Sequence, residues 1–373
     1  MPRENVYSGL RVVELTDFYA SYCGKQLAAF GAEVTKIEPL QGERTRQMGP
    51  FAGGAPHPEK SLLFAYMNTG KHSVTLDLET EVGREELLRR LKTADVFIET
   101  TTPGTLESWG LDYAALEKLN PGLVMDSVTP FGQTGPHSHW KAPTDFIIDA
   151  MGGPMYEMRK PGRAPLHLGY DILGPSCSMI ALVAIQAALR RRLETSRGAY
   201  IDLSLQECMF SYHSDVAGYA QVTEKDAEPP EGHGLIPCRD GIAYLFIGGK
   251  WDELLDWMDE MGLETAPLRT ETYDRHRYDV LAAWDDVLNS KLQQLGALYT
   301  KTGFMLEAQA RKIPAGALET ADTLLQNRQL QERGFFTEVE HPVLGKLPYM
   351  GPQGRLSAVR EDMTGRAPLL GEE

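Results

Sequence analysis

The stretch that decides the fold is GLRVVELTDFYASYCGKQLAAFGAEVTKIEP, residues 9–39. It contains a β-branched run at Arg11–Leu15, an Ala- and Leu-containing run at Gly24–Phe30 that ends at Gly31, and a second β-branched run, EVTKIEP. Glycine after a helix and proline after a strand are common terminators. The order predicts a strand, a helix and a strand, which is the unit that builds parallel sheets.

The same alternation continues through the first half of the chain. Further strands are predicted at Ser73–Leu78, Asp95–Glu99, Leu123–Val128 and 199–205, with helices at Arg84–Lys92 and Tyr113–Leu119. The run Ser176–Leu193 is apolar on nearly every side, which predicts a buried helix, and a second long helix should start near Gln206. We therefore expect an α/β protein with a Rossmann-like large domain whose sheet is mostly parallel.

A change in composition marks the predicted end of this domain. The segment VTEKDAEPPEGHG, residues 222–234, is charged, rich in Pro and Gly, and aperiodic, as linkers are. Beyond it, a strand at Ala243–Ile247 and helices at Trp251–Met261 and Val280–Ala310 predict a smaller α/β domain. We expect a large domain at 1–222, a small domain at 223–330, and a C-terminal segment at 331–373 that returns to the large domain.

Charge and cysteine content exclude several classes of protein. The 373 residues include 37 Lys and Arg against 52 Asp and Glu, a formal net charge of −15, so the basic surface that nucleic acids need is not expected. No apolar run is expected to reach the ~18–20 residues of a membrane span, and no signal-peptide pattern is seen, which favours a cytoplasmic location without membrane partners. The cysteines form no CxxC pair, and His137 and His139 have no accompanying ligand cluster, so no metal site is predicted.

The common enzyme motifs are absent from the sequence. The turn after the first predicted strand, TDFYASYCGK, lacks the glycines of a dinucleotide-binding GxGxxG. The segment NTGKHS lacks the upstream Gly of a P-loop and has His72 where Ser or Thr is needed. There is no GxSxG, HExxH or kinase motif set, so neither NAD or FAD binding nor the common hydrolase and kinase activities are predicted.

A longer series of segments, in a fixed order, is more specific. It comprises GLRVVELT, GAEVTKIEP, NTGKHSVTLDL, ADVFIE with PG at 103–104, GLDY, NP at 120–121, SVTPFGQTGP, RRLETSRGAYIDLSL, PCRDG, IPAG and HPVLG. Together these segments closely resemble the family III CoA-transferases, the CaiB/BaiF group, over nearly the whole chain. The resemblance implies a Rossmann-like large domain and a small domain, two subunits interlocked as a dimer, and CoA or acyl-CoA bound as a substrate with no permanently bound cofactor.

The resemblance also implies a nucleophile. In the transferases of the family, an Asp at the start of the buried helix attacks the acyl-CoA and forms a mixed anhydride. The CoA thiolate converts the anhydride to an aspartyl-CoA thioester, and the acceptor carboxylate opens that thioester. Counting without gaps from Pro165 and Gly169 to the Ala-Ala-Leu at 187–189 places this position at Gly174, which has no nucleophilic side chain. Asp171, three residues upstream, matches the Asp of the racemase branch if two extra residues are allowed, or it caps the helix.

Other positions of the family can be matched one by one. The racemase His corresponds to Thr144, so a racemase is not expected. The retained matches are Ala20 in the first turn, Leu76 and Asp77 beside the adenine position, and Lys141. Tyr19 and Thr100 are further candidates for CoA binding. This chain departs from the family at three places: Thr100 and Thr101 replace the usual Asn-Phe pair, Ser108 replaces an Arg, and Glu79 replaces a Lys. These replacements should weaken the binding of a ligand with several phosphates.

Three functional hypotheses follow. In the first, the chain is the accessory subunit of a two-component transferase similar to succinyl-CoA:benzylsuccinate CoA-transferase. A paralogous Asp-bearing subunit then completes a heterodimer or heterotetramer that moves CoA from a donor such as succinyl-CoA to an organic acid. In the second, the chain is a self-sufficient homodimeric transferase that uses Asp171. In the third, it is a non-catalytic binding or scaffold homologue, because a fold does not fix a function.

Overall fold

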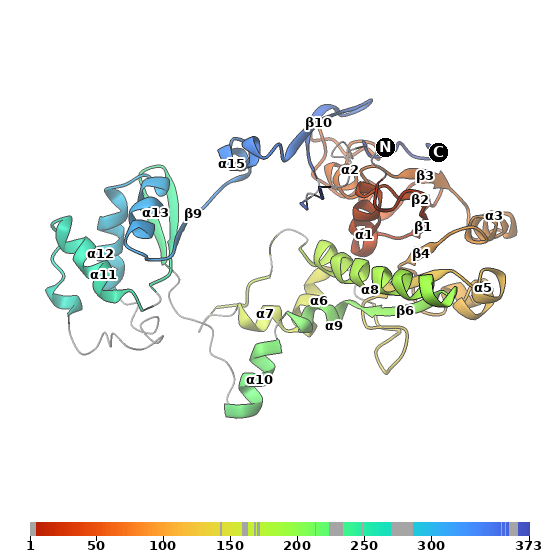
Figure 1. The fold of residues 1–373 in the computed structure, drawn as a ribbon, viewed down its shortest axis with the longest axis horizontal. Coiled ribbons are helices and arrows are strands. Elements are labelled where there is room, and N and C mark those ends of the chain that lie inside the picture. The colour runs from red at the N-terminus through yellow and green to blue at the C-terminus, as the bar shows by residue number, and fades with distance from the viewer. Residues whose placement is uncertain are drawn as a thin grey trace. The chain divides into compact units, whose positions relative to one another are not determined.

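A computed structural model describes residues 5–141, 144–158, 163–167, 169, 172–212, 214–223, 234–247, 249–269, 286–351, 353–354, 356–357 and 365–373 (Figure 1). Its largest feature is a six-stranded sheet with the order β3-β2-β1-β4-β5-β6. All neighbouring strands of this sheet are parallel. The strands are β1 (Arg11–Leu15), β2 (Glu33–Glu38), β3 (His72–Thr75), β4 (Val96–Glu99), β5 (Val124–Thr129) and β6 (Ala199–Ser204). The predicted α/β class with a mostly parallel sheet is confirmed.

Helices cover both faces of this sheet, because alternate residues of each strand point to opposite sides. Val12 lies in one core with α1 (Phe18–Ala29), α6 (Asp145–Gly152), α8 (Leu173–Thr195) and α9 (Leu205–Ser211). Val13 lies in a second core with α3 (Glu81–Leu91), α4 (Thr105–Ser108) and α5 (Tyr113–Leu119). The shorter helices of this part are η1 (Arg44–Gln47), α2 (Leu62–Met67), α7 (Pro154–Glu157) and α10 (Ser214–Thr223).

Three helix predictions need correction. Helix α1 begins at Phe18 rather than Gly24, because the Asp17 carboxylate caps it by accepting from the Tyr19 N–H at 3.3 Å. The long helix expected from Gln206 is divided into α9 and α10, and residue 213 lies outside the described residues. The helix expected over Val280–Ala310 is divided into α12 (Asp286–Ala297) and α13 (Lys301–Ala310), because the Thr300 hydroxyl caps a new helix by accepting from the Gly303 N–H at 3.1 Å, and residues 280–285 lie outside the described residues.

The expectation that no apolar run approaches the length of a membrane span was also wrong. Within the described part of the chain, α8 alone is long and apolar enough to qualify by length and composition. Only 39% of its most apolar stretch is buried within this chain, and the buried side packs against α1 in the first core.

A second compact unit comprises residues 228–330 and 160–163. Its sheet is antiparallel and contains β7 (Gly234–Cys238), β8 (Gly241–Leu245) and β9 (Ala315–Ala317). Its helical elements include α11 (Trp251–Glu260), η2 (Ala266–Leu268), α12 (Asp286–Ala297), α13 (Lys301–Ala310) and α14 (Ala321–Leu325). Trp251, Trp257 and Phe304 are buried in its core.

The last segment of the chain belongs to the first unit. After α15 (Arg328–Glu332) it forms an antiparallel hairpin of β10 (Phe336–His341) and β11 (Gly345–Met350). Its final residues run beside β3: the Ser73 N–H donates to the Glu372 carbonyl at 2.9 Å. The Arg46 guanidinium donates to the Pro368 carbonyl at 3.2 Å.

Candidate active site

The turn between β1 and α1 lies at the carboxyl edge of the parallel sheet, where α/β proteins commonly bind ligands. The backbone N–H of Asp17 in this turn donates to the Thr100 hydroxyl, which follows β4, at 3.0 Å. The Tyr19 carbonyl accepts from the Ser178 hydroxyl of α8 at 3.0 Å. Tyr19 and Ala20 are buried. The fold therefore brings Tyr19, Ala20 and Thr100 together with the first turns of α8.

A cavity of about 410 Å³ opens at the same edge, next to β1. Leu76 and Asp77, which follow β3, line it together with Leu15, Pro39, Leu40, Gln41, Leu78, Glu79 and Trp109. The indole of Trp109 and the leucines provide apolar surface for a flat ring. The charged lining residues, Asp77 and Glu79, are both acidic. This cavity can therefore hold an aromatic ring system more readily than a phosphate group.

Gly174, the residue that the sequence predicts at the position of the family's nucleophile, is tightly packed. Gly174, the second residue of α8, lies against the ring of Phe18, and a β-carbon added to it would lie 2.6 Å from Phe18 Cε1 and 2.7 Å from Cζ. Real side chains do not approach so closely, so an aspartate would need Phe18 to move. Asp171 lies outside the described residues. Lys141 is exposed, and the two residues that follow it lie outside the described residues.

Replacing Gly174 by alanine is expected to destabilise the protein by about 1–3 kcal/mol, because overpacking forces neighbouring side chains off their rotamers. Gly169→Ala is the matched control, since nothing lies within 4 Å of an added β-carbon there. Thermal unfolding of both variants measures the difference. Adding Phe18→Leu to Gly174→Ala should restore part of the loss, and equal melting temperatures for the two alanine variants would refute the tight contact.

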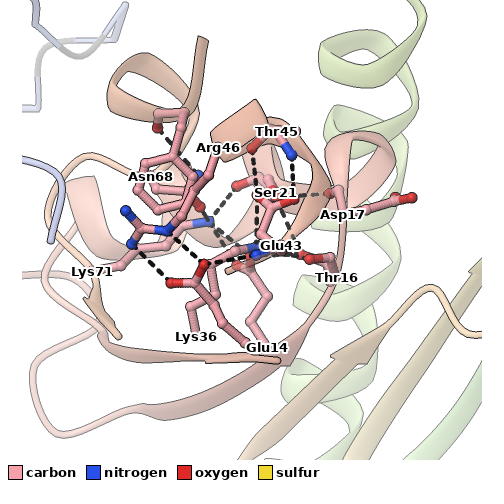
Figure 2. A network of polar contacts seen from close by, with 12 residues as sticks. Glu14, Thr16, Asp17, Ser21, Lys36, Glu43, Thr45, Arg46, Asn68 and Lys71 are labelled. Atoms are coloured by element: carbon pink, nitrogen blue, oxygen red, sulfur yellow. Dashed lines mark hydrogen bonds and ion pairs between the residues drawn. The ribbon is translucent and has the colours of Figure 1, made fainter. Parts of the chain in front are cut away.

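A network of buried charged side chains contacts the turn between β1 and α1 (Figure 2). The Glu14 carboxylate lies 3.0 Å from Lys36 Nζ and 2.8 Å from Lys71 Nζ. Lys36 also donates to the Thr16 carbonyl at 2.8 Å and to the Ser21 hydroxyl at 3.1 Å. Lys71 donates to the Ser21 carbonyl at 2.7 Å. These two ammonium groups therefore fix the backbone on both sides of Tyr19 and Ala20.

The same network extends along β2. Arg46 holds Glu38 through two hydrogen bonds of 2.7 and 2.9 Å and Glu59 through one of 2.9 Å. Lys36 lies 3.7 Å from Glu43, whose carboxylate also accepts from Thr45. Glu14, Lys36 and Arg46 are 0% exposed, so each charge depends on its partners for solvation.

Burial and charge act against each other on these groups. Burial alone would raise the pKa of Glu14, but Lys71 and Lys36 bring it below its ordinary value. Burial lowers the pKa of Lys71 to about 8, although Glu14 opposes the shift. The pKa of Lys36 is raised despite its burial, because Glu14, Glu43 and Glu38 face it. Glu14 is therefore the anion on which both lysines depend.

Comparison with known proteins decides the family. The model of CoA-transferase family III matches residues 7–373. The chain belongs to this family. It is therefore a transferase of the CoA-transferase class, as its sequence motifs predicted. Within the described residues, no group of three or more His, Cys, Asp or Glu side chains is placed to hold a metal ion.

Individual relatives agree with this membership. Succinyl-CoA–D-citramalate CoA-transferase of Chloroflexus aurantiacus is 30% identical, over 97% of this chain and 90% of that protein. The BbsE subunit of succinyl-CoA:(R)-benzylsuccinate CoA-transferase from Thauera aromatica is 28% identical, over 98% and 92% respectively. The crystal structure of a CaiB/BaiF family protein from Brucella suis superposes with a TM-score of 0.85 at 28% identity, covering 99% of this chain and 97% of that one.

Sequence reasoning missed two features of this family III site. The blocking ring of Phe18 was not anticipated, although two aromatic residues directly after the helix cap could have signalled it. The charge network was also missed, because Glu14, Lys36 and Lys71 are far apart in sequence. The signal present was a charged residue next to buried apolar positions in each of two predicted strands, at Glu14 and Lys36.

Proposed function

We propose that this chain is the accessory subunit of a two-component family III CoA-transferase. The complex moves CoA from a donor such as succinyl-CoA to an organic acid, and a paralogous subunit supplies the Asp nucleophile. The observation that carries the proposal is the contact between Gly174 and Phe18, because Gly174, which we assign to the position of the family's nucleophile, has no carboxylate and packs against the Phe18 ring. The relative BbsE, named as a subunit, supports the two-component arrangement.

An exposed apolar surface supports a partner subunit. Met179 and Val183 of α8 are 43% and 63% exposed, and Ile172, just before the helix, is 47% exposed. Large apolar side chains clustered on one surface commonly mark an interface. We propose that a paralogous subunit covers this surface in an interlocked dimer, in the cytoplasm.

The proposed chemistry divides the work between the subunits. The partner's carboxylate attacks the acyl-CoA carbonyl and releases the CoA thiolate; the thiolate then attacks the resulting anhydride, frees the donor acid and leaves CoA on the carboxylate as a thioester. The acceptor acid opens this thioester through a second anhydride, which the thiolate cleaves to give the new acyl-CoA. In this chain, Tyr19, Ala20, Leu76, Asp77, Thr100 and Lys141 are the residues proposed to contact CoA.

The alternative is a homomeric transferase in which Asp171 is the nucleophile. It would require the segment that contains Asp171 to bring the carboxylate to the bound thioester. A non-catalytic homologue is the second alternative, and the acidic residues of the 410 Å³ cavity would then reflect a lost CoA site.

An isotope-exchange experiment separates these functions. The purified chain is incubated with succinyl-CoA and labelled succinate, alone and with a paralogue that has Asp at the position of Gly174. We expect no label in succinyl-CoA from the chain alone and at least a 100-fold higher exchange rate from the pair. Exchange by the chain alone that disappears in Asp171→Ala would establish the homomeric enzyme, and no exchange in either preparation would favour the non-catalytic homologue.

A further inference from the structure

The imidazole of His167 lies between two carboxylates of α6. His167 Nδ1 is 2.6 Å from Asp149 Oδ2, and His167 Nε2 is 3.5 Å from Asp145 Oδ2. Asp145 and Asp149 are four residues apart on a helix, so both face the same side. One imidazole therefore contacts two successive turns of α6.

Burial makes the contact with Asp149 the stronger of the two. The Asp149 side chain is 1% exposed and that of Asp145 is 18% exposed. A buried carboxylate is costly unless it is hydrogen-bonded or paired, and His167 Nδ1 lies at ion-pair distance from it. Phe146, from the same helix, packs beside the imidazole with ring centroids 5.6 Å apart. The histidine is therefore fixed by a short polar contact on one side and an aromatic ring on another.

His167 joins two parts of the chain that are separate in sequence. It lies seven residues before Gly174, in the segment that leads into α8, whereas α6 begins four residues after Lys141. The contact with Asp149 therefore ties the chain that precedes α8 to the helix that follows Lys141.

We propose that His167 is a positioning residue for the CoA-transfer reaction, acting through its Nδ1 contact with Asp149, which fixes the chain entering α8 relative to α6. This inference rests on the proposed function. Exchange of CoA between two carboxylates needs no net proton transfer, so His167 acts by fixing geometry and not as a general base. A loss of about 1 Å in the placement of α8's first turn is enough to lower kcat by a large factor.

Two substitutions of His167 separate its two nitrogen atoms. The amide nitrogen of Asn lies close to the place of Nδ1, whereas the amide nitrogen of Gln lies close to the place of Nε2. In the active preparation identified by the exchange experiment, we expect His167→Asn to keep kcat within threefold of wild type. His167→Gln, His167→Ala and Asp149→Asn should each lower kcat at least 10-fold with KM changed less than threefold. His57→Ala, a change of an exposed histidine elsewhere in the chain, is the control.

The outcomes distinguish positioning from a purely structural role. A His167→Ala variant with kcat within twofold of wild type would overturn the proposal. An equal fall in kcat in His167→Ala and His167→Asn would also overturn the proposal, because the Nδ1 contact would then not matter. If His167→Ala fails to fold, the Asn and Gln variants still decide the question.

A second readout requires no turnover, so it stands even if the proposed function fails. Hydrogen exchange at the amides of Ala164, Leu166 and His167 should be at least 10-fold slower in wild type than in Asp149→Asn. Equal exchange rates in the two proteins would overturn the role of this contact in fixing the segment. Wild-type inactivity with every acid tested, together with slowed exchange, would refute the proposed function and leave the contact itself established.

Discussion

Replacing Glu14 by glutamine is expected to destabilise the protein by about 3–5 kcal/mol, because it leaves the ammonium groups of Lys36 and Lys71 without their shared anion. Both lysines are buried, and Lys71 has no other carboxylate within ion-pair distance in the described residues. For a domain of this size the loss corresponds to a fall of roughly 6–15 °C in melting temperature. Differential scanning calorimetry at pH 7 measures it.

Two further variants make this prediction specific. Glu33→Gln changes an exposed carboxylate at the start of β2 and should alter the melting temperature by less than about 2 °C. Adding Lys71→Met to Glu14→Gln removes one of the two buried ammonium groups that have lost the Glu14 carboxylate, so the double variant should be more stable than Glu14→Gln alone. If Lys71→Met made Glu14→Gln less stable, the carboxylate would not be the partner that solvates Lys71.

Replacing Lys25 by methionine is expected to stabilise the protein most strongly at low pH. Lys25 is 6% exposed, and its ammonium group lies 3.4 Å from the centre of the Tyr66 ring and has no carboxylate partner among the described ion pairs. Burial, with a smaller contribution from Lys71, lowers the pKa of Lys25 to about 7. In the unfolded chain, a lysine titrates at about 10.4.

The sign of the pH dependence follows from proton uptake. Between pH 7 and 10 the unfolded chain holds a proton on Lys25 that the folded protein lacks, so the stability of wild type rises with pH. Below pH 7 the full cost of the buried charge, roughly 3–5 kcal/mol, is present. The advantage of Lys25→Met over wild type should therefore shrink by about 2–3 kcal/mol between pH 6 and pH 9.

Urea unfolding at these two pH values measures that change. Lys118→Met, at an exposed position of α5, should show no comparable pH dependence. An advantage of Lys25→Met that stays constant between these two pH values would mean that the folded protein keeps Lys25 protonated throughout. The cation–π contact with Tyr66 would then offset the cost of burial.

Much of the fold follows from local pattern. Arg11–Leu15 and Tyr113–Leu119 were predicted with the bounds that the structure has, because β-branched periodicity and an Asp cap are local signals. The start of α1 was missed, because Phe18 and Tyr19 are poor helix formers that are held there by the Asp17 cap and by packing on α8. The division of α9 from α10 also left no recognisable mark in the sequence.

The candidate site was less accessible to sequence reasoning. Motif order identified the family, and it placed Leu76, Asp77 and Thr100, which the fold brings to the carboxyl edge of one sheet. It could not reveal that Phe18 fills the space beside Gly174, since this depends on how two helices distant in sequence pack. Nor could it reveal Glu14 between Lys36 and Lys71, which are 22 and 57 residues away.

The position of the last residues beside β3 has a consequence for how the protein folds. The Gly371 N–H donates to the Ser73 hydroxyl across 298 residues, and Arg46 contacts Pro368 across 322. Contacts between residues so far apart slow folding, because a long loop must close before they form. On the ribosome, the edge of the sheet therefore stays incomplete until residues 368–372 have been synthesised, and Arg46 has no Pro368 carbonyl to contact while the second unit is made.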